Sequence, residues 1–90
     1  MSASLAPKIA RLDEDILRLK ELQIQYETQA AAYEDQGLQW EVYPHRIVER
    51  ALAFFKANRD RAMSEHIAAR MQTLEELRNR LQEHANSTLP

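Results

Sequence analysis

The stretch IARLDEDILRLKELQIQYETQAAAY, residues 9–33, carries the pattern that decides the fold. Its apolar residues recur at alternating steps of three and four, which is the heptad seam of a helix that packs against another helix. Gln23 fills the one polar position of this seam. We predict one long helix over residues 4–36, with Ser4 as its N-cap and Pro7 in its first turn. The apolar members of the seam are Ile9, Leu12, Ile16, Leu19, Tyr26, Ala30 and Tyr33.

A second apolar stripe runs along another face of the same predicted helix. Ala10, Leu17, Ile24 and Ala31 recur every seven residues. At about 100° per residue, they lie a quarter-turn or more from the seam. Single leucines on a surface are common, so the stripe has an ordinary explanation. The regular spacing favours a second neighbour instead, and we expect Leu17 and Ile24 to contact a further helix.

Gly37 is the only glycine of the chain, and it stands where the seam ends. It suits the C′ position of a helix, where glycine adopts the left-handed conformation. Pro44 suits the first position of the next helix. We therefore predict a connection over residues 37–43, and we expect Trp40 and Tyr43 to fold back over the open end of the bundle. The alternative is an exposed aromatic tip that binds a partner.

The rest of the chain lacks glycine and, until its last residue, proline. This predicts a second helix over residues 44–86 and a frayed tail over 87–90. The apolar pattern changes midway into two stripes that would point about 120° apart on a straight helix. We favour one unbroken helix that serves two partners; the alternative is a bend near Asn58, within residues 58–62, that makes a three-helix bundle. The first stripe is Ile47, Val48, Ala51, Phe54, Phe55, Asn58 and Ala62; the second is Met63, Ile67, Met71, Leu74, Leu77 and Leu81.

The fold that these patterns predict is all-α: an antiparallel hairpin of two long amphipathic helices, within one domain of 90 residues. A chain of this size without cysteine is marginally stable alone, and small folds of this kind often gain stability by oligomerising. At about 1.5 Å per residue, the second predicted helix overshoots the first by about 15 Å. We therefore expect a homo-oligomer, simplest as a dimer, that forms a coiled-coil-like bundle. Its assembly residues would be Leu17, Ile24, Ile67, Met71, Leu74, Leu77 and Leu81.

Gln23 and Asn58 carry the polar groups that we expect to set the register of the hairpin. If the chain reverses between Gly37 and Pro44, residues that face each other have numbers that sum to about 80. Asn58 then lies nearly opposite Gln23. An amide pair there could pin the two helices in register, as single buried polar residues do in coiled coils. The alternative is that both amides face solvent.

The charges nearly balance, with 12 Lys and Arg against 14 Asp and Glu and a formal net charge of -2. A dedicated nucleic-acid-binding domain would usually be clearly basic. The most basic segment is 45–61, and we interpret it as a solvated face that complements the acidic first helix. The alternative function is a small nucleic-acid-associated regulator that contacts phosphates through this segment. The basic residues concerned are Arg46, Arg50, Lys56, Arg59 and Arg61.

The sequence contains no recognised catalytic or metal-binding motif. It has no cysteine, no glycine-rich phosphate loop and no nucleophile elbow. His45 and Glu49 are spaced for one helical face, but a metal site needs three or four ligands. We expect no metal, no cofactor, no small-molecule substrate and no catalysis. The predicted function is protein–protein interaction through helical surfaces, as an adaptor, chaperone or regulator.

The distribution of apolar residues also bears on location. The N-terminal residues show no basic segment followed by an apolar run, and no stretch approaches about 18 consecutive apolar residues. We therefore expect a cytoplasmic protein that makes no membrane contact.

Overall fold

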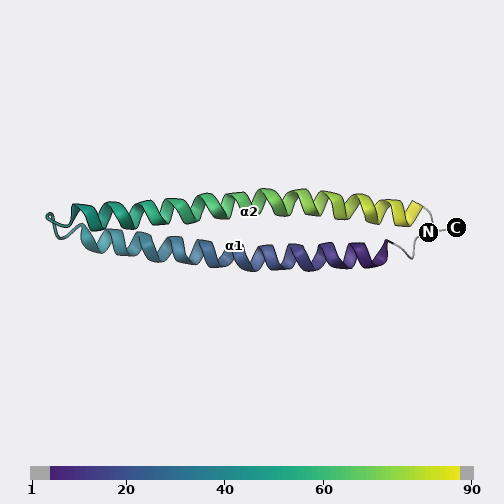
Figure 1. Ribbon diagram of the computed structural model, residues 1–90, viewed down its shortest axis with the longest axis horizontal. Helices are drawn as coiled ribbons and strands as arrows, with labels where there is room; N and C mark the ends of the chain where they lie inside the picture. The colour runs from purple at the N-terminus through teal and green to yellow at the C-terminus, as the bar shows by residue number, and fades with distance from the viewer. Residues whose placement is uncertain (1–4, 88–90) are drawn as a thin grey trace.

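The computed structural model describes residues 5–87 as two long helices that lie side by side (Figure 1). Helix α1 spans Ala6–Trp40, and helix α2 spans Ile47–Ser87. Residues 41–46 connect them, so the helices run antiparallel. The hairpin is 72 Å long and 14 × 12 Å across. The predicted all-α antiparallel hairpin is confirmed.

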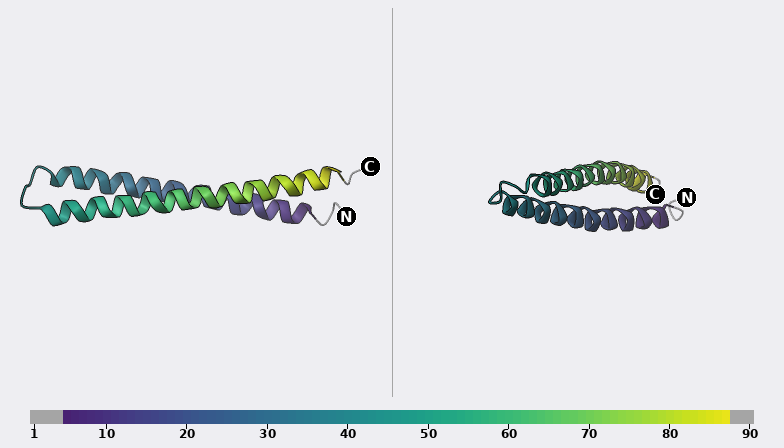
Figure 2. Two further views of the ribbon diagram at one scale, coloured as in Figure 1. Left: turned by 90° about the horizontal axis from the view of Figure 1, so that it is seen from above. Right: turned by 60° about the vertical axis from the view of Figure 1, so that its left-hand side comes forward.

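One continuous seam of α1 faces α2. Ile9, Ile16 and Ala30 are buried, and the other members of the predicted seam are half-buried. The two helices cross at a shallow angle near the middle of the hairpin (Figure 2), as in coiled-coil packing, where each seam follows its partner. The alternating steps of three and four continue through Gly37 to Trp40, and α1 accordingly runs past its predicted end.

The ends of the elements differ in part from those predicted. Pro7 stands in the first turn of α1, as expected, while the predicted N-cap Ser4 lies outside the described residues. The connection is 41–46 rather than 37–43, and Pro44 lies within it instead of opening α2. Most of the predicted tail also lies outside the described residues.

Gly37 is a core residue and not a helix C-cap. It is buried within α1, and its φ is not positive. A Cβ at this position would lie 2.8 Å from the ring of Phe54, well inside van der Waals contact. Glycine suits this position because the Phe54 ring occupies the space of a side chain, and not because the backbone needs its freedom. The predicted left-handed conformation is therefore wrong.

Helix α2 is unbroken throughout its length, so the predicted continuous helix is confirmed and the bend near Asn58 is excluded. Its side facing α1 is not the predicted first stripe. Ala53 and Ala57 are buried there, while the larger Val48 and Phe55 point to solvent. Small side chains allow the close approach of α1 in this half of the hairpin. The seam of α2 is Ala53, Ala57, Asp60, Ser64, Ile67, Met71, Leu74, Arg78, Leu81 and Ala85, all buried or half-buried.

The register of the hairpin differs from the predicted one. The Gln23 side-chain amide donates a hydrogen bond to the Ser64 carbonyl at 3.5 Å, while Asn58 is exposed. The predicted amide pair is therefore wrong, because the chain reverses at 41–46, later than expected. Gln23 itself occupies the seam, as predicted.

The two helices pair along almost their whole described length, and the predicted overhang of the second helix is wrong. Arg78 donates a 2.9 Å hydrogen bond to Asp13. Nearer the helix ends, Ile9 and Ala85 line one cavity of about 360 Å³. Helix α1 thus covers α2 almost to its end, because α1 is longer than predicted and the register is shifted.

Candidate functional site

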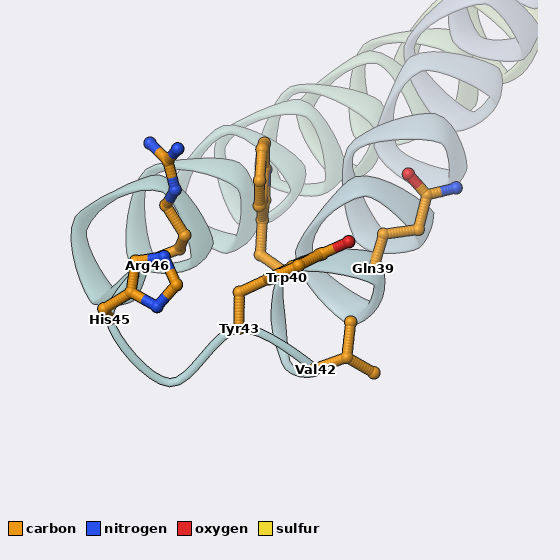
Figure 3. A pocket seen from close by; sticks show the side chains of 6 residues that line it. All are labelled: Gln39, Trp40, Val42, Tyr43, His45 and Arg46. Carbon is orange, nitrogen blue, oxygen red and sulfur yellow. The ribbon is translucent and has the colours of Figure 1, made fainter.

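A pocket of about 820 Å³ opens at the connection end of the hairpin, and we call it the tip pocket. Trp40 belongs to the last turn of α1, and Arg46 directly precedes α2. Figure 3 shows the Trp40 ring standing between the side chains of Arg46 and Gln39. The residues that line the pocket are Gln39, Trp40, Val42, Tyr43, His45 and Arg46.

Aromatic and cationic contacts order the tip pocket. The ring centroids of Trp40 and Tyr43 are 6.0 Å apart in an edge-to-face arrangement, and Tyr43 contacts His45 in the same way at 6.3 Å. The Arg46 guanidinium lies 5.6 Å from the centre of the Trp40 ring, within the range of cation–π attraction. Arg46 also donates a 3.0 Å hydrogen bond to Glu49. The pKa of Glu49 is lowered by a hydrogen bond from its own backbone N–H and then by the bond from Arg46.

These contacts place the two aromatic residues of the predicted tip differently. Trp40 is half-buried, as expected for a ring that folds back over the end of the bundle. Tyr43 stays half exposed, at 50%, as expected for an aromatic tip. Of the two arrangements considered from the sequence, folding back therefore describes Trp40 and exposure describes Tyr43.

Large apolar side chains at the connection end of the hairpin point to solvent. Val48 is 76% exposed and Phe55 is 63% exposed, because Ala53 and Ala57 occupy the seam and turn the larger residues away from α1. A gathering of exposed apolar side chains is typical of an interaction site. We call this group the tip surface: Leu38, Val42, Tyr43, Ile47, Val48, Leu52 and Phe55, each at least half exposed.

Most of the tip surface is absent from the site residues predicted from the sequence. The apolar pattern placed Val48 and Phe55 on the side of the second helix that packs in the hairpin. The signal that could have corrected this is the spacing of Ala53 and Ala57, which begins the steps of three and four that run on through Met71 to Ala85. Small residues such as alanine give a weak apolar pattern, and the larger residues beside them gave the stronger but misleading one.

The basic residues of segment 45–61 are spread around α2 rather than gathered on one surface. Arg61 pairs with Glu34 of α1, and this hydrogen bond lowers the pKa of Glu34 and raises that of Arg61. The Lys56 ammonium lies 5.5 Å from the centre of the Tyr33 ring. The other three are Arg46 at the tip pocket, half-buried Arg50 and exposed Arg59.

The residues predicted to form the assembly contact divide into a covered group and an exposed group. Ile67 and Met71 are buried against α1, and Leu74 and Leu81 are half-buried in the same seam. The overshoot predicted from the sequence would have left these four side chains exposed in a lone hairpin, but α1 extends far enough to cover them. The predicted assembly residues that stay exposed are Leu17, Ile24 and Leu77.

Polar groups interrupt the middle of the seam. Asp60 is 1% exposed, and its Oδ2 has no hydrogen-bond partner among residues 5–87. Its Oδ1 lies 3.5 Å from the guanidinium of Arg59. The hydroxyl of Ser64, one turn further on, donates a 3.1 Å hydrogen bond to Glu27. A buried carboxylate oxygen without a partner is costly, so we expect Asp60 to lower the stability of the hairpin.

Replacing Asp60 with alanine is expected to stabilise the hairpin by about 1–3 kcal/mol, the usual cost of an unsatisfied buried polar group. Ala53 and Ala57 already occupy the two preceding seam positions, so an alanine side chain suits the close helix approach. Urea denaturation followed by circular dichroism measures the change. The Asp60→Asn variant removes the charge and keeps the shape, so its free energy of unfolding should lie between those of the unmodified protein and the Asp60→Ala variant. A less stable Asp60→Ala variant would contradict this account and show that contacts of the carboxylate, such as that with Arg59, outweigh the cost of its burial.

Two further features of residues 5–87 bear on function. No group of three or more His, Asp or Glu side chains in this range is arranged to hold a metal ion. Neither described helix carries an apolar stretch of the length and hydropathy needed to cross a membrane.

In comparisons with known proteins, no family model, no curated protein and no solved structure matches the sequence. The surfaces of the hairpin are therefore the basis on which its function is inferred.

Proposed function

We propose that the protein is a non-catalytic protein-binding module of the adaptor, chaperone or regulator class, and that it docks a protein partner on the tip surface. The observation that carries this proposal is the gathering of large exposed apolar side chains at one end of the hairpin, between Leu38 and Phe55. Larger exposed apolar patches on a protein often mark the place where another molecule binds.

The residues of the tip pocket support a protein partner. Trp, Tyr and Arg are enriched among the residues that dominate binding energy at protein interfaces, and Trp40, Tyr43 and Arg46 line this pocket together. Their ring and cation–π contacts hold them in place before binding. Ordering that precedes binding reduces the entropy cost of docking.

The first turns of α2 carry an exposed apolar strip at the same end of the hairpin. Val48, Leu52 and Phe55 are each at least half exposed, and they follow the i, i+4, i+7 spacing by which a helix presents an apolar face to a partner. Burial of one such side chain contributes about 1.5–3 kcal/mol. The strip therefore supplies a substantial part of the binding free energy that a docking partner needs.

Partner capture by matched variants tests this proposal. Val48→Glu with Phe55→Glu places two charges on the tip surface, while Gln72→Glu with Asn79→Glu places the same charges on exposed positions in the other half of α2. The tagged protein should retain a partner from an extract of the native cell, and the tip variant should capture about tenfold less of it, or even less. The control variant should retain it, and all proteins should keep equal helix content. A partner captured equally well by the tip variant would contradict docking at this surface.

We further propose that the hairpin associates with itself through surfaces other than the tip. Leu17 and Ile24, which recur seven residues apart, remain exposed on α1. A 90-residue hairpin only two helices thick buries little apolar surface of its own. Association would cover these side chains and add to a thin core.

A further inference from the structure

One flank of α2 forms a long stripe of basic residues, which we call the basic stripe. Its positions recur in alternating steps of three and four, and they carry no Asp or Glu from residue 56 to residue 84. Lys56 is half-buried, and the others are exposed. The fully charged members are Lys56, Arg59, Arg70 and Arg80, and Met63 and Leu77 lie between them.

A groove of about 410 Å³ lies within the basic stripe. The apolar side chains of Leu19, Met63 and Ile67 line it together with Arg70 and His66. A phosphate backbone offers nothing apolar to such a groove. The groove instead fits a partner that presents apolar and acidic side chains side by side.

The outer face of α1 presents that combination, and we call it the acidic stripe. Leu17 and Ile24 are 57% and 62% exposed. Glu14 and Glu21 precede them by three residues each, which places each carboxylate beside an apolar side chain on the same helix face. The basic residues one turn from members of this stripe are Lys20, beside Leu17 and Ile24, and Arg11 and Arg18, beside Glu14.

We propose that the acidic stripe of one copy packs on the basic stripe of a second copy, with Ile24 seated in the groove beside Met63. This inference rests on the self-association proposed above and names its two surfaces. Pairing of the acidic stripe with itself would oppose Glu14 and Glu21 to like charges, and the basic stripe paired with itself would do the same. The crossed pairing brings opposite charges together, which sets partner and orientation in helical assemblies.

The crossed pairing is heterologous, because its two surfaces are different. Each copy keeps one stripe free after the first contact, so a heterologous contact that does not close into a ring grows without limit. The mean mass should therefore rise with concentration beyond a dimer. It should fall as salt is added, because exposed charges are screened within about 10 Å at about 0.1 M ionic strength.

Charge reversal on each stripe tests the contact. Arg70→Glu with Arg80→Glu replaces two positive charges of the basic stripe with negative ones, and Glu14→Lys with Glu21→Lys replaces both negative charges of the acidic stripe with positive ones. Each variant alone should need about tenfold or more protein to assemble than the unmodified chain. An equimolar mixture should assemble again, because every contact in an alternating series then pairs opposite charges. Sedimentation velocity at low salt measures the mass distribution of each sample.

Three further variants test whether a loss of assembly comes from this contact. Glu76→Lys with Glu83→Lys makes the same charge change at exposed positions outside both stripes and should assemble as the unmodified protein does. Ile24→Ala changes no charge and should weaken assembly. The tip variant described above should assemble normally, so that a failure of docking and a failure of assembly are distinguishable. Circular dichroism verifies that each variant keeps its helix content.

The outcomes that would overturn the inference are distinct. A monomer mass for the unmodified protein at high micromolar concentration would end self-association and this contact together. Assembly that persists in both charge-reversal variants, or a mixture that fails to assemble, would leave self-association standing and remove the crossed pairing. Binding of a single-stranded oligonucleotide to the monomer, lost on Arg70→Glu with Arg80→Glu, would assign the basic stripe to nucleic acid instead.

Discussion

Ile16→Ala should lower the free energy of unfolding of the hairpin by about 2–5 kcal/mol, while Ile24→Ala should change it by less than about 0.5 kcal/mol. The two isoleucines belong to the same helix and differ in burial, at 8% and 62% exposed. Truncation of Ile16 removes contacts with α2 and leaves a cavity. Truncation of Ile24 removes atoms that lie in water as long as the protein is monomeric.

Urea denaturation of both variants at low protein concentration measures this difference. A loss at Ile16 of the expected size is a large fraction of the stability of a domain this small. Equal losses at the two positions would mean that α1 does not face α2 with its predicted seam. If Ile24→Ala lowers the free energy of unfolding only at high protein concentration, the loss comes from contacts that the acidic stripe makes in an assembly.

Gly37→Leu should destabilise the hairpin by about 1–3 kcal/mol, although leucine is a far better helix former than glycine. A Cβ at Gly37 would already meet the Phe54 ring at 2.8 Å, and the leucine side chain adds three more carbon atoms. If only backbone freedom mattered at this position, the substitution would gain up to about 1 kcal/mol of helix propensity. The sign of the change therefore separates the two explanations.

Thermal and urea denaturation measure the effect, and a double variant identifies its cause. Phe54→Ala removes the ring that fills the space above Gly37. In the Phe54→Ala background, Gly37→Leu should cost less or stabilise, which gives a coupling free energy between the two sites. Additive effects would show that the ring and the glycine are not in contact.

The seam of α1 was predictable because its members are large. Ile9, Ile16 and Leu19 at heptad spacing leave no other face for a helix to bury. The first half of α2 was not predictable in the same way, because its seam consists of small or polar residues such as Ala57 and Asp60. Which side of α2 faces α1 depends on how closely the helices approach, and that depends on residues such as Gly37 in the other helix.

The predicted register is wrong because of a single residue, Gly37. Gly37 resembles a helix C-cap in the sequence, and taking it as the end of the first helix moved the turn toward the N-terminus. A turn placed a few residues too early shifts every pair across the hairpin. The predicted register therefore pairs Gln23 with Asn58, whereas the residue opposite Gln23 is Ser64. The same shift makes the second predicted helix extend beyond the first. The predicted overhang followed from this single misplacement.

The basic residues show why a run of charges along the sequence does not predict which charges share one face of a helix. Arg59 and Arg61 are neighbours in the sequence, but successive positions on a helix point in different directions. Arg61 pairs with Glu34, while Arg59 shares the basic stripe with Arg70. The aromatic residues of the connection were found from the sequence because a turn brings them to one end whatever the register. The rest of the tip surface depends on the rotation of α2, which the sequence pattern misjudged.

The rotation of α2 at the connection end can be measured with two single-cysteine variants, Phe55→Cys and Ala57→Cys. The chain has no cysteine, so each variant carries one thiol. Position 55 is 63% exposed and position 57 is 1% exposed. In the folded protein, the thiol at position 55 should react with a maleimide nearly as fast as in urea, and the thiol at position 57 about a hundredfold more slowly. A protected thiol at position 55 and a reactive one at position 57 would show that the large apolar side chains face α1, and would remove the tip surface on which the proposed function rests.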